Sequence, residues 1–598
     1  MLKSSKKGEF QVIEHNVDLC IVGGGMAGVL AAIAASRHGA KVLLMNDRPV
    51  LGGNASSEVR MWIRGARGEN LQETGVLEEI ALENIYRNPY LNFSIWDSVL
   101  YEAVRFEPNI ELVLNCSCCD LEMEGQFISE VRGWQTTTQR WHKVKARLFA
   151  DCSGDSVLAP LSGAAFRWGR EASDEFNEDI EPTVADRRTM GMSCLIQARE
   201  TSSLKTYIPP KWANKYTKED FPYRMPINDS SVWKKQNFWW MELGGLQDSI
   251  SDTEEIRDEL LKVAFGVWDF IKNSGYCEAE NWELDWVGFL PGKRESRRYV
   301  GKHILTQNDV QSGGKFSDIV AYGGWSMDDH HPGGFRHRGK PTVYHHAPSP
   351  YGIPYRCLYS KNVQNLLFAG RNISATHAAL SSTRVMATCA MLGQAIGTAA
   401  AIAVRYDILP QGVYENHIEE LKQMLMEDDC YLPWNVREIP YLTQKSKIKA
   451  SHGNPTVLVN GIDRPVGDEY NGWIAPLNSW VKLDFRGEVK IKQVRIVFDS
   501  DINRKTWDEI DDQIKRFPMR CNVFLNQEPV ILPKTLIKAF RLEISDGEGK
   551  WRTIYREVNN YRRLVKVELD AITTSAIRLV PESTWGCDEA RIFAFDAR

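Results

Sequence analysis

Several patterns that would place this 598-residue chain in a familiar class are missing. Its twelve cysteines lack the regular spacing of a disulfide framework, and no C-x-x-C-x-x-C run predicts an iron–sulfur cluster. The formal charge of −5 is weak for this length and gives no reason to expect nucleic acid as a partner. The basic N-terminus has no apolar run before the first predicted strand, so no signal peptide is visible. We therefore expect a cytoplasmic location, or a periplasmic one if the N-terminus has been trimmed.

Two further stretches each match a simple functional pattern, a C-x-x-C pair and a membrane-length apolar run. In both, the surrounding residues favour a structural role. Cys116 and Cys119 form a C-x-x-C pair, but they lie in a stretch that alternates like strands, which favours a structural role. Residues 385–404 run for twenty residues without a charge, long enough to cross a membrane. That run is rich in Ala, Gly and Thr and poor in Leu and Phe, so it predicts a tightly packed internal helix and no membrane partner.

A strand, a glycine turn, a helix and a second strand follow one another near the N-terminus. "VDLCIV" predicts a buried strand, "GGGMAG" follows at once, a helix ends at Gly39, and "AKVLLMN" predicts the next strand. In Gly23-x-Gly25-x-x-Gly28 the first glycine makes the turn and the second lets the backbone approach a pyrophosphate, while the third lets helix and strand pack closely. The pattern predicts a dinucleotide-binding unit, and by itself it does not separate NAD from FAD.

Changes in composition and in the predicted secondary structure along the chain indicate three domains. Residues 16–160 and 355–430 are expected to form a discontinuous dinucleotide-binding domain, and residues 161–354 an inserted α+β substrate domain with a helix at 252–275. Short strands and turns from about residue 446 predict a β-sandwich over residues 445–598. The expected fold class is therefore an α/β, Rossmann-like fold with an insertion, plus a C-terminal all-β jelly-roll sandwich.

Further stretches resemble the FAD-dependent oxidoreductases with a glutathione-reductase-like fold, and more narrowly the family related to the flavin-binding heterodisulfide reductases. They are "RPVLGGNAS", "DCSGDSVLAPLSGA", "GFLPGKRESRRYVGKHILT" and "LLFAGRNISATHAALSSTRVMATCAMLGQAIG", and the likeness covers about residues 18–403. The resemblance implies FAD as the cofactor. No second glycine-rich fingerprint predicts a site for NAD(P)H. "ASHGNPTVLVNGIDRPVGDEYNGWIAPLNSWVKLDF" likewise resembles the opening of discoidin-type, galactose-binding-like sandwiches.

The resemblance also implies which residues contact FAD. A helix beginning near Ser382, Thr383 and Arg384 would aim its positive N-terminal end at the flavin N1/C2=O edge. The chain departs from the family at Asn46, where a Glu or Asp that bonds the ribose is expected. The implied cofactor residues are Gly23, Gly25, Gly28, Asn46, Asp47, Arg48, Gly53, Asn54, Asp155, Gly370, Arg371, Thr383 and Arg384.

The stretch "GGWSMDDHHPGGF" is the most chemically suggestive in the sequence. Its adjacent residues His330 and His331 point apart on an extended chain, and neither helical His pairs nor a cysteine knuckle is present, so no metal is expected. A histidine next to an aspartate can accept a proton, since the carboxylate fixes its tautomer. We expect the catalytic residues to be among His330, His331, His377 and Arg297, and the substrate contacts to be Arg294, Glu295, Arg298 and Asp329.

The sequence therefore predicts an FAD-dependent oxidoreductase that acts on a polar small molecule or glycan, with a carbohydrate-derived substrate as one candidate. One alternative is an inactive flavin-fold protein that serves as a glycan-binding module, which Asn46 and the C-terminal domain favour. Another is a polysaccharide lyase, which needs a base and charge neutralisation but no dinucleotide fold. The electron acceptor and the oligomeric state stay open.

Overall fold

The computed structural model of the protein describes residues 10–224, 232–504, 522–545 and 550–598. The chain divides into two compact units. Unit 1 comprises residues 1–66, 90–421 and 513–529. Unit 2 comprises residues 67–89, 422–512 and 530–598. Each unit therefore includes a segment that the order of the sequence would assign to the other.

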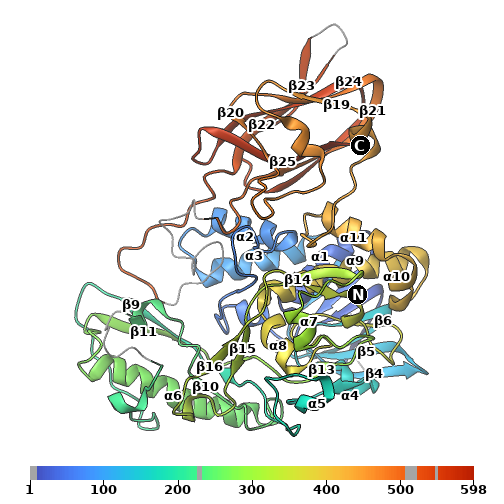
Figure 1. Ribbon diagram of the computed structural model, residues 1–598. Coiled ribbons are helices and arrows are strands. Elements are labelled where there is room, and N and C mark those ends of the chain that lie inside the picture. Colours follow the sequence, from blue (N-terminus) through green and yellow to red (C-terminus); the bar gives the residue numbers. More distant parts are fainter. Residues whose placement is uncertain (1–9, 225–231, 505–521, 546–549) are drawn as a thin grey trace. The chain divides into compact units, whose positions relative to one another are not determined.

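Unit 1 contains a mixed sheet that is parallel over most of its strands, and Figure 1 labels its strands β4, β5 and β6. Strand β1 (Val12–Val22) pairs in parallel with β2 (Val42–Met45) on one side and with β6 (Arg140–Asp151) on the other. β3 (Ile110–Val113) extends the sheet beyond β2, and β18 (Leu366–Phe368) pairs with the end of β6. Two strands more than two hundred residues apart in the chain therefore lie side by side.

Strand β6 combines two kinds of pairing. Its first half pairs in antiparallel fashion with β5 (Phe127–Gln135), which in turn pairs with β4 (Cys116–Glu124). Cys116 and Cys119 lie on β4 as free thiols, so the C-x-x-C pair is on a strand, as predicted. Burial raises the pKa of Cys116 to about 12, which disfavours a reactive thiolate.

Two apolar helices, α1 (Met26–Arg37) and α9 (Met386–Tyr406), pack closely together. A Cβ atom at Gly393 would lie 2.0 Å from the carbonyl oxygen of Ala27, so glycine lets the two backbones touch. Helix α9 is long and apolar enough to cross a membrane, but 94% of its most apolar stretch is buried inside the protein. Its small residues thus serve internal packing.

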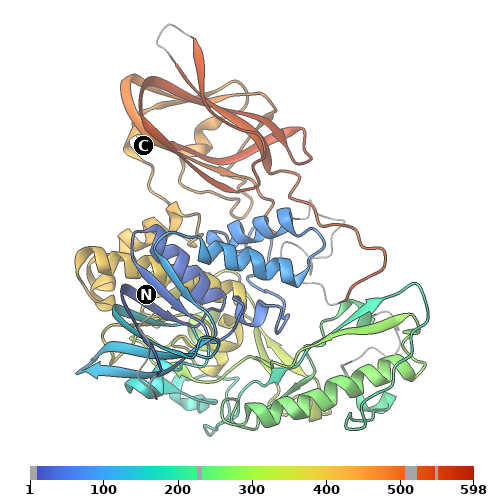
Figure 2. The ribbon, with the colours of Figure 1, turned by 180° about the vertical axis from the view of Figure 1, so that it is seen from behind.

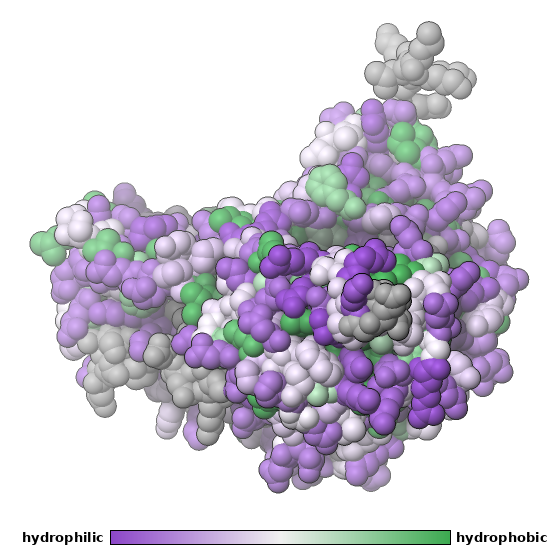
Figure 3. Space-filling model, turned by 90° about the horizontal axis from the view of Figure 1, so that it is seen from above, coloured by the Kyte–Doolittle hydropathy of each residue, from purple (hydrophilic) through white to green (hydrophobic). Residues whose placement is uncertain are grey.

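On the face shown in Figure 3, hydrophilic residues predominate and hydrophobic ones form small, separate spots.

The start of α9 differs from the prediction. The sequence predicted one helix that begins near Ser382 and continues through the uncharged run of residues 385–404, but a separate helix α8 (His377–Thr383) ends before α9 begins at Met386. Val385 between them has an extended backbone (φ −66°, ψ 141°), which interrupts the helical hydrogen bonds. The predicted single helix beginning near Ser382 was therefore wrong at its start and correct at its end.

Residues 161–354, here called the insert, contain short strand pairs and one long helix. Helix α6 (Thr253–Asn273) is the helix predicted for 252–275, and Figure 2 shows it running along this part of the chain. The strand pairs are β8 (Met192–Ser193) with β10 (Glu242–Leu243) and β12 (Gly292–Lys293), β9 (Ile196–Glu200) with β11 (Trp282–Val287), β13 (Arg298–Tyr299) with β7 (Phe166–Arg167), β14 (Ile319–Gly323) with β17 (Tyr351–Pro354), and β15 (Met327–His330) with β16 (Thr342–His345).

Aromatic side chains fill the core of the insert. Trp233 packs edge-on against both Trp268 and Trp282, with ring centres 5.9 and 5.1 Å apart. Val523 exchanges backbone hydrogen bonds with Ala198 and Glu200 on β9, so a segment from late in the chain completes this part of unit 1. The other helices of unit 1 are α3 (Phe93–Arg105), α4 (Leu158–Ser162), α5 (Ser173–Phe176), α7 (Gln307–Gln311) and α10 (Pro410–Asn416).

Unit 2 is built on one antiparallel sheet whose two long strands, β21 (Val481–Phe498) and β24 (Leu564–Thr584), pair along most of their length with shifts of register. Stacking of Tyr86 on Tyr561, with ring centres 4.2 Å apart, attaches helix α2 (Val76–Arg87) to the same unit. Its other strands are β19 (Lys447–Ala450), β20 (Trp473–Pro476), β22 (Ile537–Ser545), β23 (Trp551–Glu557) and β25 (Glu589–Ala597), and its helices include α2 (Val76–Arg87) and α12 (Tyr441–Lys445), with α11 (Ile418–Glu427) at its boundary. The sheet formed by the C-terminal residues confirms the all-β architecture that was predicted for that region.

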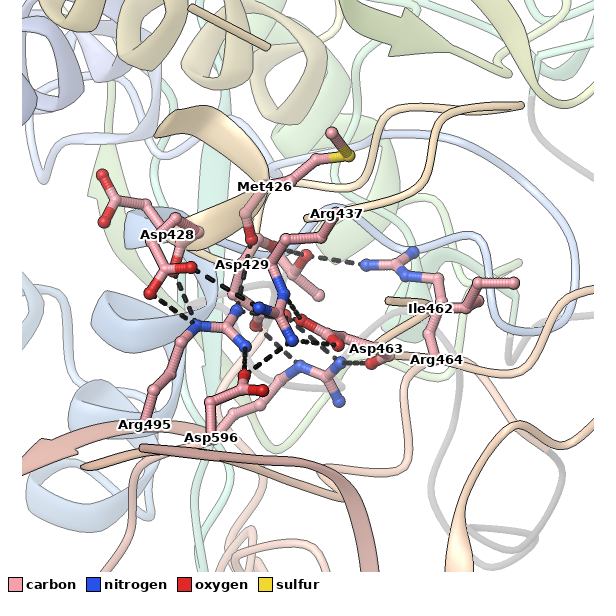
Figure 4. A network of polar contacts seen from close by, with 12 residues as sticks. Met426, Asp428, Asp429, Arg437, Ile462, Asp463, Arg464, Arg495 and Asp596 are labelled. Carbon is pink, nitrogen blue, oxygen red and sulfur yellow. Dashed lines mark hydrogen bonds and ion pairs between the residues drawn. The ribbon is translucent and has the colours of Figure 1, made fainter. Parts of the chain in front are cut away.

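A buried network of arginines and carboxylates fastens the segment before the sheet to the strands of unit 2 (Figure 4). Arg495 on β21 contacts Asp463 at 2.9 Å and donates to the carbonyl oxygen of Glu427, also at 2.9 Å. Arg437 contacts Asp463 at 3.0 Å and Asp596 on β25 at 2.7 Å. Because these side chains are taken out of water, each charge depends on its partners for compensation.

We predict that Arg495→Ala destabilises unit 2 strongly, because Asp463 and Asp596 would lose a buried counter-charge. Removing one member of a buried ion pair typically costs about 3–5 kcal/mol. The control is Arg556→Ala, because Arg556 is 61% exposed in its side chain and its pair with Glu582 should contribute less than about 1 kcal/mol. Denaturant unfolding of the full chain measures both. Equal midpoints for the two variants would show that the network is not structural.

Candidate functional site

Of the three fingerprint glycines after β1, which are Gly23, Gly25 and Gly28, packing requires two and leaves the third free to vary. A Cβ atom at Gly23 would lie 2.5 Å from the backbone of Cys152, and one at Gly28 would lie 1.9 Å from the carbonyl oxygen of Gly23. A Cβ atom at Gly25 would meet no protein atom within 4 Å. The space beside Gly25 is therefore where a ligand can approach the backbone.

Asn46 follows β2 and secures this loop. Its side-chain oxygen accepts a hydrogen bond from the backbone N–H of Gly24 at 2.9 Å, and its amide donates to the carbonyl oxygens of Arg48 and Val50. An acidic side chain could not make the two donated bonds, which gives a structural reason for asparagine here. Asp47 and Arg48 are exposed and lie 3.7 Å apart as a loose ion pair.

Two predicted cofactor positions from other segments lie beside the loop. Gly52 donates its N–H to the carbonyl oxygen of Gly24 at 2.8 Å, and a Cβ atom at Gly53 would lie 3.1 Å from the Cα atom of Gly25. The amide of Asn54 donates to the carbonyl oxygen of Lys293 at 3.0 Å. The structure therefore brings Gly25, Gly53 and Asn54 together and connects them to β12 of the insert.

Asp155, which follows β6, is paired with two cations. Arg371 and Lys293 each contact its carboxylate at 2.8 Å, and the hydroxyl of Ser296 donates to it at 2.7 Å. Burial alone would raise the pKa of Asp155, but the charges of Arg371 and Lys293 outweigh it and hold the pKa at about 2. Asp155 is therefore an anion across the physiological pH range. It positions Arg371, which follows Gly370 (φ 120°) at the end of β18.

Three buried donors near these elements have no hydrogen-bond partner among the described residues. They are Nε of Arg371, the hydroxyl of Thr383 and Nε of Arg384. A buried donor without a partner costs free energy, so these positions favour a ligand rich in acceptor atoms. The phosphate and flavin carbonyl oxygens of FAD are such acceptors. Together with the open space at Gly25, the residues present fit the cofactor that the sequence implied.

The first of two histidine networks contains His330. Its Nδ1 lies 2.6 Å from Glu242, and its Nε2 lies 3.3 Å from Asp328. Asp328 also lies 3.4 Å from Arg384, and Glu242 lies 3.5 Å from Arg294. Burial would raise the pKa of Asp328, but the charges of His330 and Arg384 keep it well below its usual range. This network therefore links the insert to the residue after α8.

The second network contains His377, the first residue of α8. Its Nδ1 lies 3.0 Å from both carboxylate oxygens of Glu295, and its Nε2 lies 3.3 Å from Asp329. Arg298 pairs in turn with Glu295 and with Glu171. Burial lowers the pKa of His377, but the charges of Glu295 and Asp329 outweigh it and raise the pKa well above its usual value. His377 is therefore an imidazolium, which can give a proton but has no free nitrogen to take one.

The alternation of side chains along β15 separates the two networks. Asp328 and His330 are two residues apart and lie in one network, whereas Asp329 between them lies in the other. The same alternation holds for Arg294, which contacts Glu242, and its neighbour Glu295, which contacts His377. Asp328, Asp329 and His330 thus lie on a strand whose two faces hold different charged clusters. Among the described residues, no group of three or more side chains has the arrangement of a metal site.

The remaining predicted residues lie elsewhere or play other parts. His331 is exposed and stacks on His337 at 3.6 Å, so it points away from His330, as the extended chain predicted. Arg294 and Arg298 are 6% and 0% exposed and donate to protein acceptors. Their geometry indicates that they orient carboxylates, whereas the sequence predicted that they contact substrate. Arg297 donates to the carbonyl oxygen of Asp155 at 3.3 Å.

Sequence reasoning missed Glu242, Glu171 and Lys293, which complete these networks. Glu242 stands alone in "MELGG", a stretch with no motif, and Glu171 lies in an acidic segment that resembles a solvated surface. Lys293 adjoins the "RESRR" run that the sequence did single out. The position of Lys293 next to this run was the one signal in the sequence. Glu242 and Glu171 gave none, because the fold brings them to the networks from distant segments.

A family model described as FAD dependent oxidoreductase matches residues 18–425. Two curated proteins named fumarate reductase (cytochrome), from Shewanella frigidimarina and its strain NCIMB 400, are each 46% identical over 54 residues. That stretch is 9% of this chain and 10% and 9% of the two relatives, so the chain spans about a tenth of their length.

Solved carbohydrate-binding modules are similar to about a quarter of the chain. The family 32 module of Streptococcus pneumoniae EndoD is 14% identical over 26% of this chain and 97% of that one, with a TM-score of 0.20. Chitosan-binding module 1 of a chitosanase/glucanase from Paenibacillus sp. IK-5 is 10% identical over 26% of this chain and 97% of that one, with a TM-score of 0.18.

The glycine loop generates a prediction that separates ligand binding from folding. Gly25→Ala should leave the melting temperature nearly unchanged, because its Cβ atom meets no protein atom, and should lower the amount of FAD retained, because it fills the approach to the backbone. Gly28→Ala is the contrast, because its Cβ atom clashes with Gly23 and should destabilise the fold itself. Flavin absorbance per protein and thermal melting of the apoprotein check both. Full FAD retention by Gly25→Ala would show that the cofactor does not use this loop.

Proposed function

Because this chain belongs to the FAD-dependent oxidoreductase family and has FAD as its cofactor, we propose that it moves a hydride between a polar substrate and the flavin while residues of the insert move a proton. The family membership confirms the oxidoreductase class and the cofactor predicted from the sequence. We also propose that residues 16–160 and 355–430 form a Rossmann-like cofactor domain and that the insert supplies the substrate side.

The observation that carries this proposal is the position of His377 between two carboxylates at the start of α8. The same helix ends at Thr383 and Arg384, which have unpartnered buried donors among the described residues. Six residues of helix span about 9 Å, so α8 carries a proton-holding group at one end and a proposed flavin contact at the other. Asp328 and Asp329 connect β15 to both ends of α8, through Arg384 and His377 respectively.

When bound, FAD supplies the hydride acceptor or donor at its N5 position. The chain itself handles the proton. In the direction of substrate reduction, His377 gives its proton through Asp329 to the substrate. In the direction of oxidation the carboxylate of Asp329, oriented by the His377 imidazolium, takes the proton from the substrate. Asp329 is the exposed end of this pair, with 26% of its side chain accessible, whereas Glu295 is fully buried behind His377.

The arrangement suits a substrate with hydroxyl groups. A carboxylate such as Asp329 accepts a hydrogen bond from a hydroxyl and fixes its orientation. His330 between Glu242 and Asp328 holds β15 and Arg384 in place, so we assign it to positioning the site. A carbohydrate-derived alcohol or hydroxy acid is the substrate class that we propose.

The direct test is flavin reduction under anaerobic conditions. Purified protein supplied with FAD should show flavin absorbance, and a panel of sugars and hydroxy acids should contain a compound that bleaches it. His377→Gln should retain the flavin and slow the bleaching by about 100- to 10,000-fold, the usual contribution of a positioned acid or base.

The matched control is His417→Gln, because His417 stacks on Tyr406 and pairs with Glu420, apart from both networks. It should bleach at the wild-type rate. Absence of flavin absorbance after FAD is added would contradict the proposal, because hydride transfer to the flavin requires bound FAD. Flavin binding without bleaching by any donor would favour the inactive alternative, and release of unsaturated uronate products from polysaccharides would favour the lyase.

A second candidate function, contact with a glycan, has one observation in its favour. On the sheet of unit 2, the ammonium group of Lys482 lies 5.9 Å from the ring centres of both Trp480 and Trp551. Arg578 covers Trp551 at 4.2 Å. Tryptophan rings flanked by cations form a surface on which sugar rings stack and acidic sugars are attracted.

We predict that Trp551→Ala weakens binding of the full chain to acidic polysaccharides by at least about tenfold, the loss of about 1.4 kcal/mol, if this surface is used. Trp212→Ala is the control, because Trp212 is also partly exposed but lies in unit 1. Affinity electrophoresis in polysaccharide gels gives the measurement. Equal retardation of the two variants would remove this candidate.

A further inference from the structure

His331 lies beside Asp329, the accessible end of the proton-handling pair, and the proposed function gives it no role. The backbone N–H of His331 donates to the carbonyl oxygen of Pro341 at 3.0 Å, so the pairing of β15 with β16 continues through this residue. Residues two apart on an extended chain face the same side and lie about 7 Å apart. His331 and Asp329 are therefore neighbours on one face of the strand, and the side chains of both reach solvent.

Two contacts fix the ring of His331 and leave one of its nitrogens as a donor. The backbone N–H of Gly333 donates to Nδ1 of His331 at 3.0 Å. Because Nδ1 is the acceptor in this hydrogen bond, the ring carries its hydrogen on Nε2. The ring of His337 stacks on that of His331, with centres 3.6 Å apart and planes 10° apart. His331 thus presents one N–H donor in a fixed plane.

Packing around Gly245 brings Arg188 to the same place. A Cβ atom at Gly245 would lie 2.3 Å from the carbonyl oxygen of Thr189 and 2.6 Å from that of Pro332. Thr189 also donates its N–H to the carbonyl oxygen of Gly245 at 2.9 Å. Thr189 follows Arg188 and Pro332 follows His331, so these two side chains extend from stretches of backbone that lie side by side.

Asp186 compensates the charge of Arg188 only in part. Arg170 donates to both carboxylate oxygens of Asp186, to one of them at 3.1 Å. Nε of Arg188 lies 3.7 Å from the same carboxylate, which is too far for a hydrogen bond, and the Arg188 side chain is 56% exposed. One carboxylate thus serves two guanidinium groups, which leaves a positive charge in excess near His331.

Resting on the proposed function, we propose that His331 and Arg188 bind a carboxylate group of the substrate, which is therefore a sugar acid such as a hexuronate. Asp329 accepts from a hydroxyl group, while the N–H of His331 and the guanidinium of Arg188 hold an anion about 7 Å further along the strand. That spacing is about the width of one pyranose ring, in which the C1 hydroxyl and the C6 carboxylate lie at opposite ends. The role proposed for His331 is substrate specificity, whereas the sequence predicted catalysis.

The test compares sugars that differ only at C6. D-Galacturonate and D-glucuronate carry a carboxylate where D-galactose and D-glucose carry a CH2OH group. Isothermal titration calorimetry measures the binding of each sugar to the full chain with bound FAD, and anaerobic flavin reduction is followed in parallel. At least one acid should bind about tenfold or more tightly than its neutral counterpart, because charge-assisted hydrogen bonds are stronger than neutral ones.

Two variants test the residues themselves. His331→Phe removes the N–H and keeps a ring that can stack on His337, and Arg188→Gln removes the charge. Each should weaken binding of the acid by about tenfold and leave binding of the neutral sugar nearly unchanged. In flavin reduction each should raise KM for the acid with little change in kcat, because neither residue moves the proton. Arg188→Lys should recover part of the affinity.

The matched control is Arg187→Gln. Arg187 is the next residue in the chain and lies over the ring of Trp168, 5.8 Å from its centre, so it faces away from Asp186. This variant loses the same charge as Arg188→Gln and should bind the acid as the wild type does. A loss equal to that in Arg188→Gln would show that overall charge, and no specific site, attracts the acid.

The outcomes separate this inference from the proposed function. Equal affinity for the acid and the neutral sugar in both pairs would overturn the inference, as would acid binding that neither His331→Phe nor Arg188→Gln weakens. Failure of all four sugars to bind would overturn the assignment to hexuronates. Acid binding that both variants weaken, in a protein whose flavin no compound reduces, would retain the carboxylate site and remove the hydride transfer. Flavin reduction without a preference for acids would do the reverse.

Discussion

The site depends on one constraint, which is that charges removed from water must be compensated within a few ångströms. His377 is held by Glu295 and Asp329, and Glu295 is held by Arg298. None of these groups is stable alone in a buried position, so each fixes the orientation of the next. The order of the cluster is thus a product of electrostatics. Backbone rigidity supplies only the starting points, at the ends of α8, β13 and β15.

Strand alternation turns this constraint into two separate clusters. Because neighbouring residues of β15 face opposite ways, one short strand compensates His330 on one face and His377 on the other. A helix at this place would turn by only about 100° between Asp328 and Asp329, so the two side chains could not face opposite sides. The extended conformation therefore lets two like charges be neighbours in sequence and belong to different environments.

The sequence predicted what depends on local pattern. The glycine loop, the helix at 252–275, the small-residue helix and the all-β C-terminal region follow from spacing and composition over short windows. The sequence missed what depends on distant partners. Glu242 carries no motif, and its importance arises from its contact with His330, many residues away. Arg294 and Arg298 were predicted to contact substrate, and the structure buries both of them against protein acceptors.

The exchange of segments between the units has a consequence for how this protein can change over time. Residues 67–89 belong to unit 2 although they interrupt the chain of unit 1, and residues 513–529 belong to unit 1 although they interrupt the chain of unit 2. A single recombination event between the two halves of the gene would leave each product with a missing piece and a surplus one. The oxidoreductase unit and its all-β companion are therefore expected to be inherited together, unlike modules that are joined by one linker and shuffled freely among enzymes.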